Sequence, residues 1–108
     1  MKLLEGKTAI VTGGARGIGK AIALKFASQG ANIAFSDIRI DDQADELVKE
    51  IEKSSVKAVA YQSDASDLTG SEDFIKKVMD DFGKVDVLVN NAGITRDNLL
   101  MRMSEEEW

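Results

Sequence analysis

The sequence predicts an α/β fold that forms the N-terminal portion of a doubly wound parallel sheet. Two observations lead to this prediction. Short apolar strand-like runs alternate with amphipathic helical segments in the order β-α-β-α-β-α-β, and a glycine-rich turn joins the first strand to the first helix. Such alternation implies parallel strands joined by right-handed helical crossovers, and we expect the strand order 3-2-1-4.

Each expected element has a simple basis in the residue pattern. The expected strands are residues 8–11, 32–36, 56–62 and 85–89, and the expected helices are 17–29, a segment around 44–51, and one between Thr69 and Gly83. The strands are short and apolar, as buried parallel strands are. The helices repeat apolar residues at helical spacing. These residues are Ile18, Ile22 and Phe26 (with Ala21 and Ala27 beside them), then Ala44, Leu47, Val48 and Ile51, and finally Phe74, Ile75, Val78, Met79 and Phe82.

Residues that cap helices mark several of the boundaries. Gly30 stands where a C-terminal cap of the first helix belongs. Thr69 and Glu72 have the spacing of a capping box for the third helix. Ser104 and Glu107 have the same spacing and predict a further helix start close to the end of the sequence.

Composition limits the classes of function. With 108 residues, 44% of them hydrophobic, the chain fits one globular domain and not a disordered segment. A net charge of −5 argues against general nucleic-acid binding, which needs a basic face. The absence of Cys and His excludes disulfides, metal sites built on thiolates or histidines, and a Ser-His-Asp triad within this sequence. No signal peptide or long apolar run is present, so we expect no membrane partner and a cytoplasmic location.

The glycine-rich turn, residues 12–19, is the strongest functional signal. Glycines at positions 13, 17 and 19 permit a sharp turn, keep side chains away from a ligand, and let the helix pack closely on the sheet. The helix start offers unpaired N–H groups and a positive dipole end to phosphate oxygens. The turn therefore predicts a dinucleotide site, although an ordinary strand-to-helix turn shows a similar pattern in isolation. The expected cofactor-binding residues here are Gly13, Gly14, Ala15, Arg16, Gly17, Ile18 and Gly19.

A carboxylate at the end of the second strand supports the same prediction. Asp37 follows Gly17 at about the 20-residue offset expected for an acid that binds a ribose 2′-hydroxyl, although a solvated loop acid is the alternative. Its charge would repel the 2′-phosphate of NADP and so favours NAD. Arg16 and Arg39 favour NADP, because a guanidinium pairs well with a phosphate. The choice stays open, with a preference for NAD on account of Asp37.

Polar residues also follow the third and fourth strands. Asp64 and Ala65 come after the third strand, where the Asp can accept a hydrogen bond from an adenine amino group or can serve as a turn residue. Asn91, Ala92 and Gly93 belong to an Asn-Asn-Ala-Gly run after the fourth strand. Its amides can tie neighbouring strand ends together, and its small residues leave room for a ribose and a nicotinamide. Turn chemistry alone is the other explanation.

In combination, these motifs resemble the short-chain dehydrogenase/reductase family over the whole stretch from Lys7 to Trp108. Residues 12–19 match its cofactor turn, 64–65 its adenine-contacting pair, and 90–93 its Asn-Asn-Ala-Gly signature. The segment 93–103 resembles the subgroup that reduces 3-oxoacyl thioesters of acyl-carrier protein. The resemblance implies that residues 1–108 are the N-terminal cofactor-binding part of a single Rossmann domain.

For the whole enzyme, the resemblance implies NADP(H)-dependent reduction of 3-oxoacyl-[acyl-carrier-protein] in fatty acid biosynthesis, on a homotetramer. Asp37 departs from this pattern, because many members that use NADPH lack an acid at that position. The family's catalytic Asn, Ser, Tyr and Lys would lie beyond Trp108, so no catalytic residue is assigned here. Tyr61 does not qualify, because no Lys follows it four residues later.

Two other functions compete with this one. The chain could belong to a short-chain dehydrogenase acting on a sugar alcohol, a steroid or another carbonyl compound. It could also be a non-catalytic nucleotide-binding module in which 108 residues are the entire product. In that case we expect poor folding and no catalysis, because the strand at 85–89 would form an open edge and the core would be small.

Overall fold

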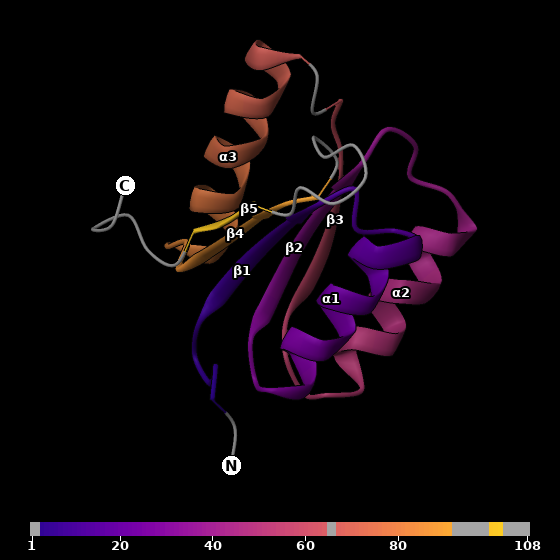
Figure 1. The fold of residues 1–108 in the computed structure, drawn as a ribbon, viewed down its shortest axis with the longest axis vertical. Coiled ribbons are helices and arrows are strands. Elements are labelled where there is room, and N and C mark those ends of the chain that lie inside the picture. Colours follow the sequence, from indigo (N-terminus) through magenta and orange to yellow (C-terminus); the bar gives the residue numbers. More distant parts are fainter. Residues whose placement is uncertain (1–2, 65–66, 92–99, 103–108) are drawn as a thin grey trace.

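A computed structural model describes residues 3–64, 67–91 and 100–102. Its elements are β1 (Thr8–Thr12), α1 (Gly17–Ser28), β2 (Asn32–Asp37), α2 (Asp42–Glu52), β3 (Ala58–Gln62), α3 (Leu68–Phe82), β4 (Val87–Asn90) and β5 (Leu100–Arg102). The sheet has the order β3-β2-β1-β4-β5, with α1 and α2 on one face and α3 on the other (Figure 1). The predicted α/β class and the strand order 3-2-1-4 are confirmed.

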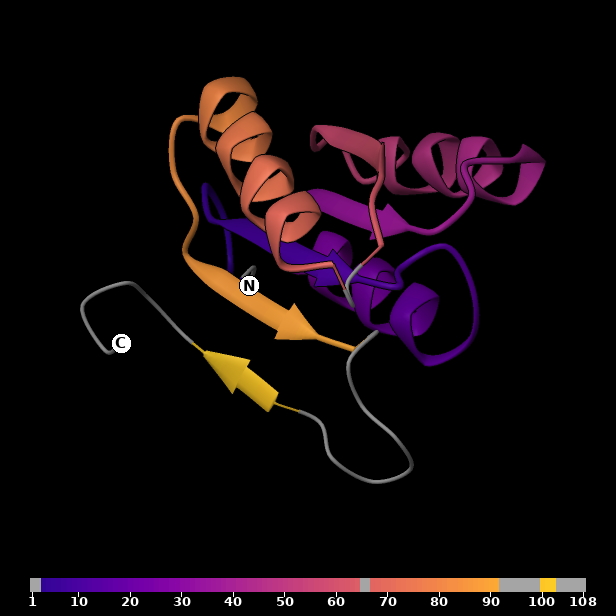
Figure 2. The ribbon, with the colours of Figure 1, turned by 90° about the horizontal axis from the view of Figure 1, so that it is seen from above.

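The last strand was absent from the expected pattern. β5 runs antiparallel to β4, with Leu88 opposite Arg102 and Asn90 opposite Leu100, and Figure 2 shows the two arrows pointing in opposite directions. The expected pattern of four strands therefore missed β5, and the edge of β4 that four strands alone would leave open is paired with it. A strand of three residues is too short for an alternating pattern to reveal it.

Side chains of each strand alternate between the two faces of the sheet. On the face covered by α1 and α2, the core is built from alternate strand residues and small helix residues: Ala9, Val11, Ile33, Phe35, Val87 and Val89 with Ala23, Ala27, Ala44, Leu47 and Ile51. On the other face, Phe74 and Val78 of α3 pack with Ile10, Ala34 and Tyr61. β1 and β2 therefore bury both faces, and β3 does so in part, which explains their nearly continuous apolar sequences.

The buried stripe of α1 differs from the predicted one. Gly19, Ala23 and Ala27 are buried, whereas Ile18 is 62% exposed and Ala21 is exposed. The helix lies so close to the sheet that only residues without a long side chain fit between them. The prediction that Ile18, Ile22 and Phe26 form the centre of the buried face is therefore wrong. Ile22 and Phe26 are half-buried at the margin of that face.

Helix α3 starts one residue before the predicted cap. Asp67 is its N-cap, and its Oδ1 accepts a hydrogen bond from Thr69 N–H at 3.1 Å, so the predicted capping box of Thr69 and Glu72 is wrong. The Asp67 carboxylate lies two residues before Thr69 and accepts from its N–H group, so the cap does not require Glu72. The predicted glycine ends are confirmed: Gly83 caps α3 with φ +81°, and Gly30 follows α1 with φ +95°.

Other boundaries move by one or two residues. β3 begins at Ala58 and not at residue 56, and β4 covers Val87–Asn90 where 85–89 was expected. The predicted helix start at Ser104 lies outside the described residues. Among the described helices, none has the length and apolar character needed to cross a membrane.

Candidate functional site

The glycine-rich turn depends on glycine for two different reasons. Gly13 and Gly17 have φ values of +64° and +59°, in the left-handed region that L-residues avoid. Gly19 is needed for space, because a Cβ atom there would lie 2.2 Å from the carbonyl oxygen of Gly13 and 2.8 Å from Nδ2 of Asn91. The turn thus passes directly beneath the first turn of α1.

Strand β2 holds the turn from one side. Gly14 N–H donates to the carbonyl oxygen of Ser36 at 2.9 Å, and Ala15 N–H donates to Oδ2 of Asp37 at 3.3 Å. A Cβ atom on Gly14 would come within 2.6 Å of Cβ of Phe35, so the close approach to β2 requires glycine here as well. Asp37 therefore fixes the turn in addition to any contact with a ligand.

Strand β4 holds the turn from the other side. Nδ2 of Asn91 donates to the carbonyl oxygen of Gly13 at 3.2 Å, and the Thr12 hydroxyl donates to Oδ1 of Asn90 at 3.2 Å. The expectation that the two amides tie neighbouring strand ends together is confirmed. The turn is consequently fixed at the carboxyl ends of β1, β2 and β4, which is where open parallel sheets bind ligands.

The N-terminus of α1 has no cap of its own. Its N-cap residue, Arg16, makes no capping hydrogen bond, and the first turn contains no acid. Within the described part of the chain, the N–H groups of Gly17, Ile18 and Gly19 have no acceptor. Among the described residues, nothing lies within 4 Å of a Cβ atom built on Gly17, so this position leaves room for a ligand. These donors and the helix dipole fit an anionic group such as a pyrophosphate.

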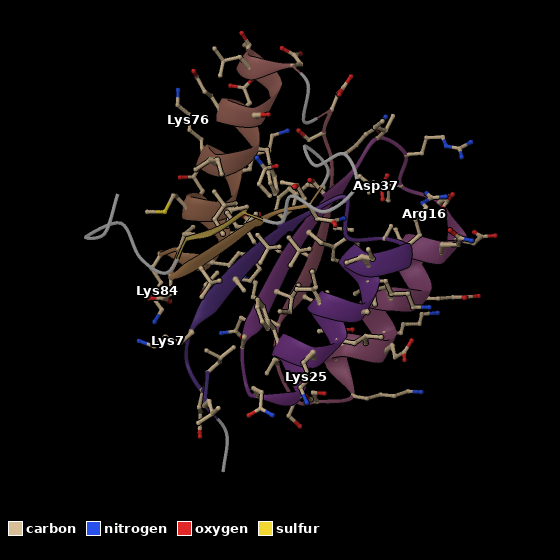
Figure 3. All side chains as sticks on the ribbon, in the orientation of Figure 1. Lys7, Arg16, Lys25, Asp37, Lys76 and Lys84 are labelled. Atoms are coloured by element: carbon tan, nitrogen blue, oxygen red, sulfur yellow. The ribbon has the colours of Figure 1, made fainter. Side chains whose placement is uncertain are left out.

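Arg16 lies between two carboxylates. Its Nε is 3.7 Å from Oδ2 of Asp37, and its Nη2 is 3.6 Å from Oδ2 of Asp41; Figure 3 shows Arg16 and Asp37 next to each other above α1. The two residues expected to pull the cofactor preference in opposite directions are thus paired with each other. Arg39 is exposed and makes no ion pair with any residue in the described ranges.

A groove with a volume of about 620 Å³ lies at the carboxyl end of β3, beside the start of α3. This volume is within the usual range for small-molecule sites. Its lining includes Ile38, which follows Asp37, and the exposed Asp64. The predicted site residues Ala65, Ala92 and Gly93 lie outside the described residues.

Tyr61 has a structural position. Its ring is buried and packs edge-on against Phe74 at 5.3 Å between ring centres, and its hydroxyl donates to the Asp81 carboxylate. Burial and this hydrogen bond raise the pKa of Tyr61 far above its ordinary value of 10.0. A phenol so held stays protonated near neutral pH.

Asp41 and Ser36 were missed by the sequence reasoning. Asp41 directly precedes an amphipathic helix, which is the place for an N-cap, and its Oδ1 accepts from Gln43 N–H at 3.1 Å. The N-cap role of Asp41 could therefore have been predicted from its position before the helix. Ser36 takes part through its backbone carbonyl oxygen, for which side-chain identity gives no signal.

Residues 7–108 match the family model described as short chain dehydrogenase. A 3-oxoacyl-[acyl-carrier-protein] reductase of Staphylococcus epidermidis is 49% identical over 102 residues, which are 94% of this chain and 42% of that protein. The enzyme of the same name from Thermotoga maritima is 48% identical over 105 residues, 97% of this chain and 42% of that protein. The chain therefore spans about two-fifths of the length of these relatives.

Solved structures show the same likeness. A short chain dehydrogenase from Burkholderia cenocepacia in complex with NADP has a TM-score of 0.81 and 42% identity, over 88% of this chain and 39% of that one. An NAD⁺-bound xylitol dehydrogenase has a TM-score of 0.80 and 33% identity, over 86% of this chain and 35% of that one. Both coenzymes thus occur among structures with this fold.

Proposed function

Since this chain belongs to the short-chain dehydrogenase family, we propose that it is the dinucleotide-binding part of an NAD(P)H-dependent oxidoreductase. In the whole protein, the proposed reaction is reduction of a 3-oxoacyl-[acyl-carrier-protein] to the 3-hydroxyacyl thioester in fatty acid biosynthesis. The 49% identity to a reductase of that name supports this substrate class. A cytoplasmic homotetramer is part of the same proposal.

The uncapped start of α1 is the observation that carries dinucleotide binding. Three N–H groups, at residues 17–19, have no acceptor among the described residues and lie at the positive end of the helix dipole. The neighbouring strands hold the turn in place, so little ordering is needed when a pyrophosphate binds.

Each predicted site residue has a proposed role toward the bound dinucleotide. The glycine-rich turn holds the pyrophosphate, and Asp37 accepts a hydrogen bond from a ribose hydroxyl. Asp64 and Ala65 orient the adenine, whereas Asn91, Ala92 and Gly93 leave space for the nicotinamide ribose. When bound, the nicotinamide supplies the hydride for carbonyl reduction.

The preferred coenzyme in this proposal is NAD(H), although the family resemblance favours NADP(H). Asp37 is only 14% exposed in its side chain and already accepts a hydrogen bond from the turn, so its negative charge is fixed beside the site. A 2′-phosphate would approach that charge. Calorimetric titration of the protein with NAD⁺ and NADP⁺ tests this preference, and tighter binding of NADP⁺ would contradict it.

A polyol substrate is the second candidate, because one of the similar structures is named a xylitol dehydrogenase, and xylitol is a polyol. The deciding experiment follows oxidation of NADH and NADPH at 340 nm by the complete gene product with a 3-oxoacyl thioester. The same protein is assayed in the oxidative direction with polyols and hydroxysteroids. Turnover of the thioester alone supports the reductase. Turnover of polyols or steroids alone replaces it, and dinucleotide binding without any turnover leaves a nucleotide-binding module.

A further inference from the structure

Asp41 lies beside the glycine-rich turn and contacts it through Arg16. Its two carboxylate oxygens have different partners: Oδ1 accepts from Gln43 N–H at 3.1 Å, and Oδ2 lies 3.6 Å from Nη2 of Arg16. The capping bond fixes the carboxylate at the start of α2. The second oxygen is thereby directed toward Arg16.

We propose that Asp41 is a positioning residue for coenzyme choice: together with Asp37, it holds the Arg16 guanidinium away from a 2′-phosphate and so disfavours NADP(H). This inference rests on the proposed dinucleotide binding. A guanidinium recognises a phosphate through its planar set of N–H donors. Here two of its nitrogens face carboxylates, and one positive charge is matched against two negative charges.

The contact between Arg16 and Asp41 is exposed enough for another anion to replace Asp41 as the partner of Arg16. The side chains of Arg16 and Asp41 are 43% and 41% exposed, so solvent screens their attraction and the pair is not a buried structural bridge. A bound 2′-phosphate therefore competes with Asp41 for Arg16. Arg39 also lies near the end of β2 but has no carboxylate partner in the described ranges, so its charge is not what Asp41 restrains.

The central test is Asp41→Asn, measured by calorimetric titration with NADP⁺ and NAD⁺. Asn caps helices about as well as Asp, so the start of α2 is kept while the negative charge is removed. We expect NADP⁺ affinity to rise about threefold to fivefold, as befits one exposed ion pair, while NAD⁺ affinity changes less.

The matched control is Asp42→Asn. Asp42 is the next residue, is exposed in the first turn of α2, and makes no ion pair with Arg16 among the described contacts. The variant changes net charge equally but leaves the contact intact. An equal gain in NADP⁺ affinity from Asp42→Asn would overturn the proposal, because the effect would then be the general field of α2.

A second pair of variants locates the effect on Arg16. In an Arg16→Gln background, Asp41→Asn should no longer change the ratio of the two affinities. If the gain persists there, Arg39 or another cation carries it and the proposal is wrong. A wild-type protein that binds neither coenzyme removes the proposed function and this inference together. Binding by the wild type, with an unchanged ratio in Asp41→Asn, removes this inference only.

Discussion

The two ends of the parallel strands differ in how their polar groups are used. At the amino ends, Thr8 N–H donates to the Asp86 carboxylate and Asp86 N–H donates to the Thr8 carbonyl oxygen, both at 2.9 Å. Lys84 lies 3.3 Å from the same carboxylate, and Lys7 is at the same end of the sheet in Figure 3. At the carboxyl ends, three N–H groups at the start of α1 have no acceptor among the described residues.

Residues that contribute to stability and residues that contribute to binding therefore lie at opposite ends of the same strands. Groups at the amino ends pair with each other, so changes there should alter the free energy of unfolding and leave ligand affinity unchanged. At the carboxyl ends, hydrogen bonds hold the glycine-rich turn in position and the N–H groups of residues 17–19 have no acceptor among the described residues, so changes there should alter affinity. The variants below test how cleanly the two properties separate.

Gly19→Ala should have the largest effect, because it should lower both stability and dinucleotide affinity. Its Cβ atom would lie 2.2 Å from a backbone oxygen of the turn, and backbone cannot move aside as a flexible side chain can. We expect a loss of about 3 kcal/mol in the free energy of unfolding, at the upper end for overpacking, together with loss of dinucleotide binding. Chemical denaturation and a fluorescence titration with NADH measure the two effects. A variant as stable as the wild type would contradict the close approach.

Gly17→Asp should remove binding with a smaller effect on folding. A side chain at this position meets open space, so the expected cost is about 1–2 kcal/mol from the left-handed backbone alone. The added carboxylate would occupy the place of the anion. Gly17→Ala is the control, because it has the same backbone strain without the charge and should retain measurable affinity. Unchanged NADH affinity in Gly17→Asp would remove the proposed role of the turn.

Asp67→Ala should lower stability, at a residue that also lines the groove beside β3. It removes the N-cap of α3, and we expect a loss of about 1 kcal/mol. Asp67→Asn keeps a capping oxygen and should unfold within a few tenths of a kcal/mol of the wild type. Equal melting temperatures for the Ala and Asn variants would show that the cap contributes nothing.

Asp86→Asn should produce the smallest effect, and that effect should depend on pH. Burial alone would raise the pKa of Asp86, but the Thr8 N–H and the charges of Lys84 and Lys7 lower it below its ordinary value of 3.8. The ionised form therefore stabilises the fold above about pH 4, and this stabilisation is lost as pH falls through the lowered pKa.

At neutral pH we expect Asp86→Asn to lose about 0.5 kcal/mol, because its amide oxygen still accepts from Thr8 while the ion pair is gone. Urea unfolding at pH 7 and pH 3 measures the difference, which should be smaller in acid. Coenzyme affinity should stay at the wild-type value. A change in affinity would show that the two ends of the sheet are coupled.

The fold was predictable because its signals are local and repeated. The four parallel strands are apolar runs and the helices have clear periods, so order and class follow from sequence. The buried face of α1 was not predictable in the same way. Helical spacing places Ile18 on the apolar face of the helix. Only the distance between helix and sheet decides that alanines fill the interface.

The site shows the same division. The glycine-rich turn and Asp37 were predictable from type and spacing, and the structure brings them together. The contact between Arg16 and Asp41 was not, because it joins a turn to a helix cap across 25 positions of sequence. The three-dimensional course of the loop decides that Asp41, and not the adjacent Asp42, faces the Arg16 guanidinium.

The way β2 and β4 hold the glycine-rich turn has a consequence for amide hydrogen exchange. Gly14 and Ala15 donate their amide protons to acceptors on β2, whereas the next turn of chain, residues 17–19, has no acceptor within the described residues. The amide protons of residues 14 and 15 should therefore exchange slowly and those of residues 17–19 rapidly, only a few residues apart. A bound pyrophosphate would slow the fast group and leave the slow group unchanged. The boundary itself would then report occupancy of the site, residue by residue.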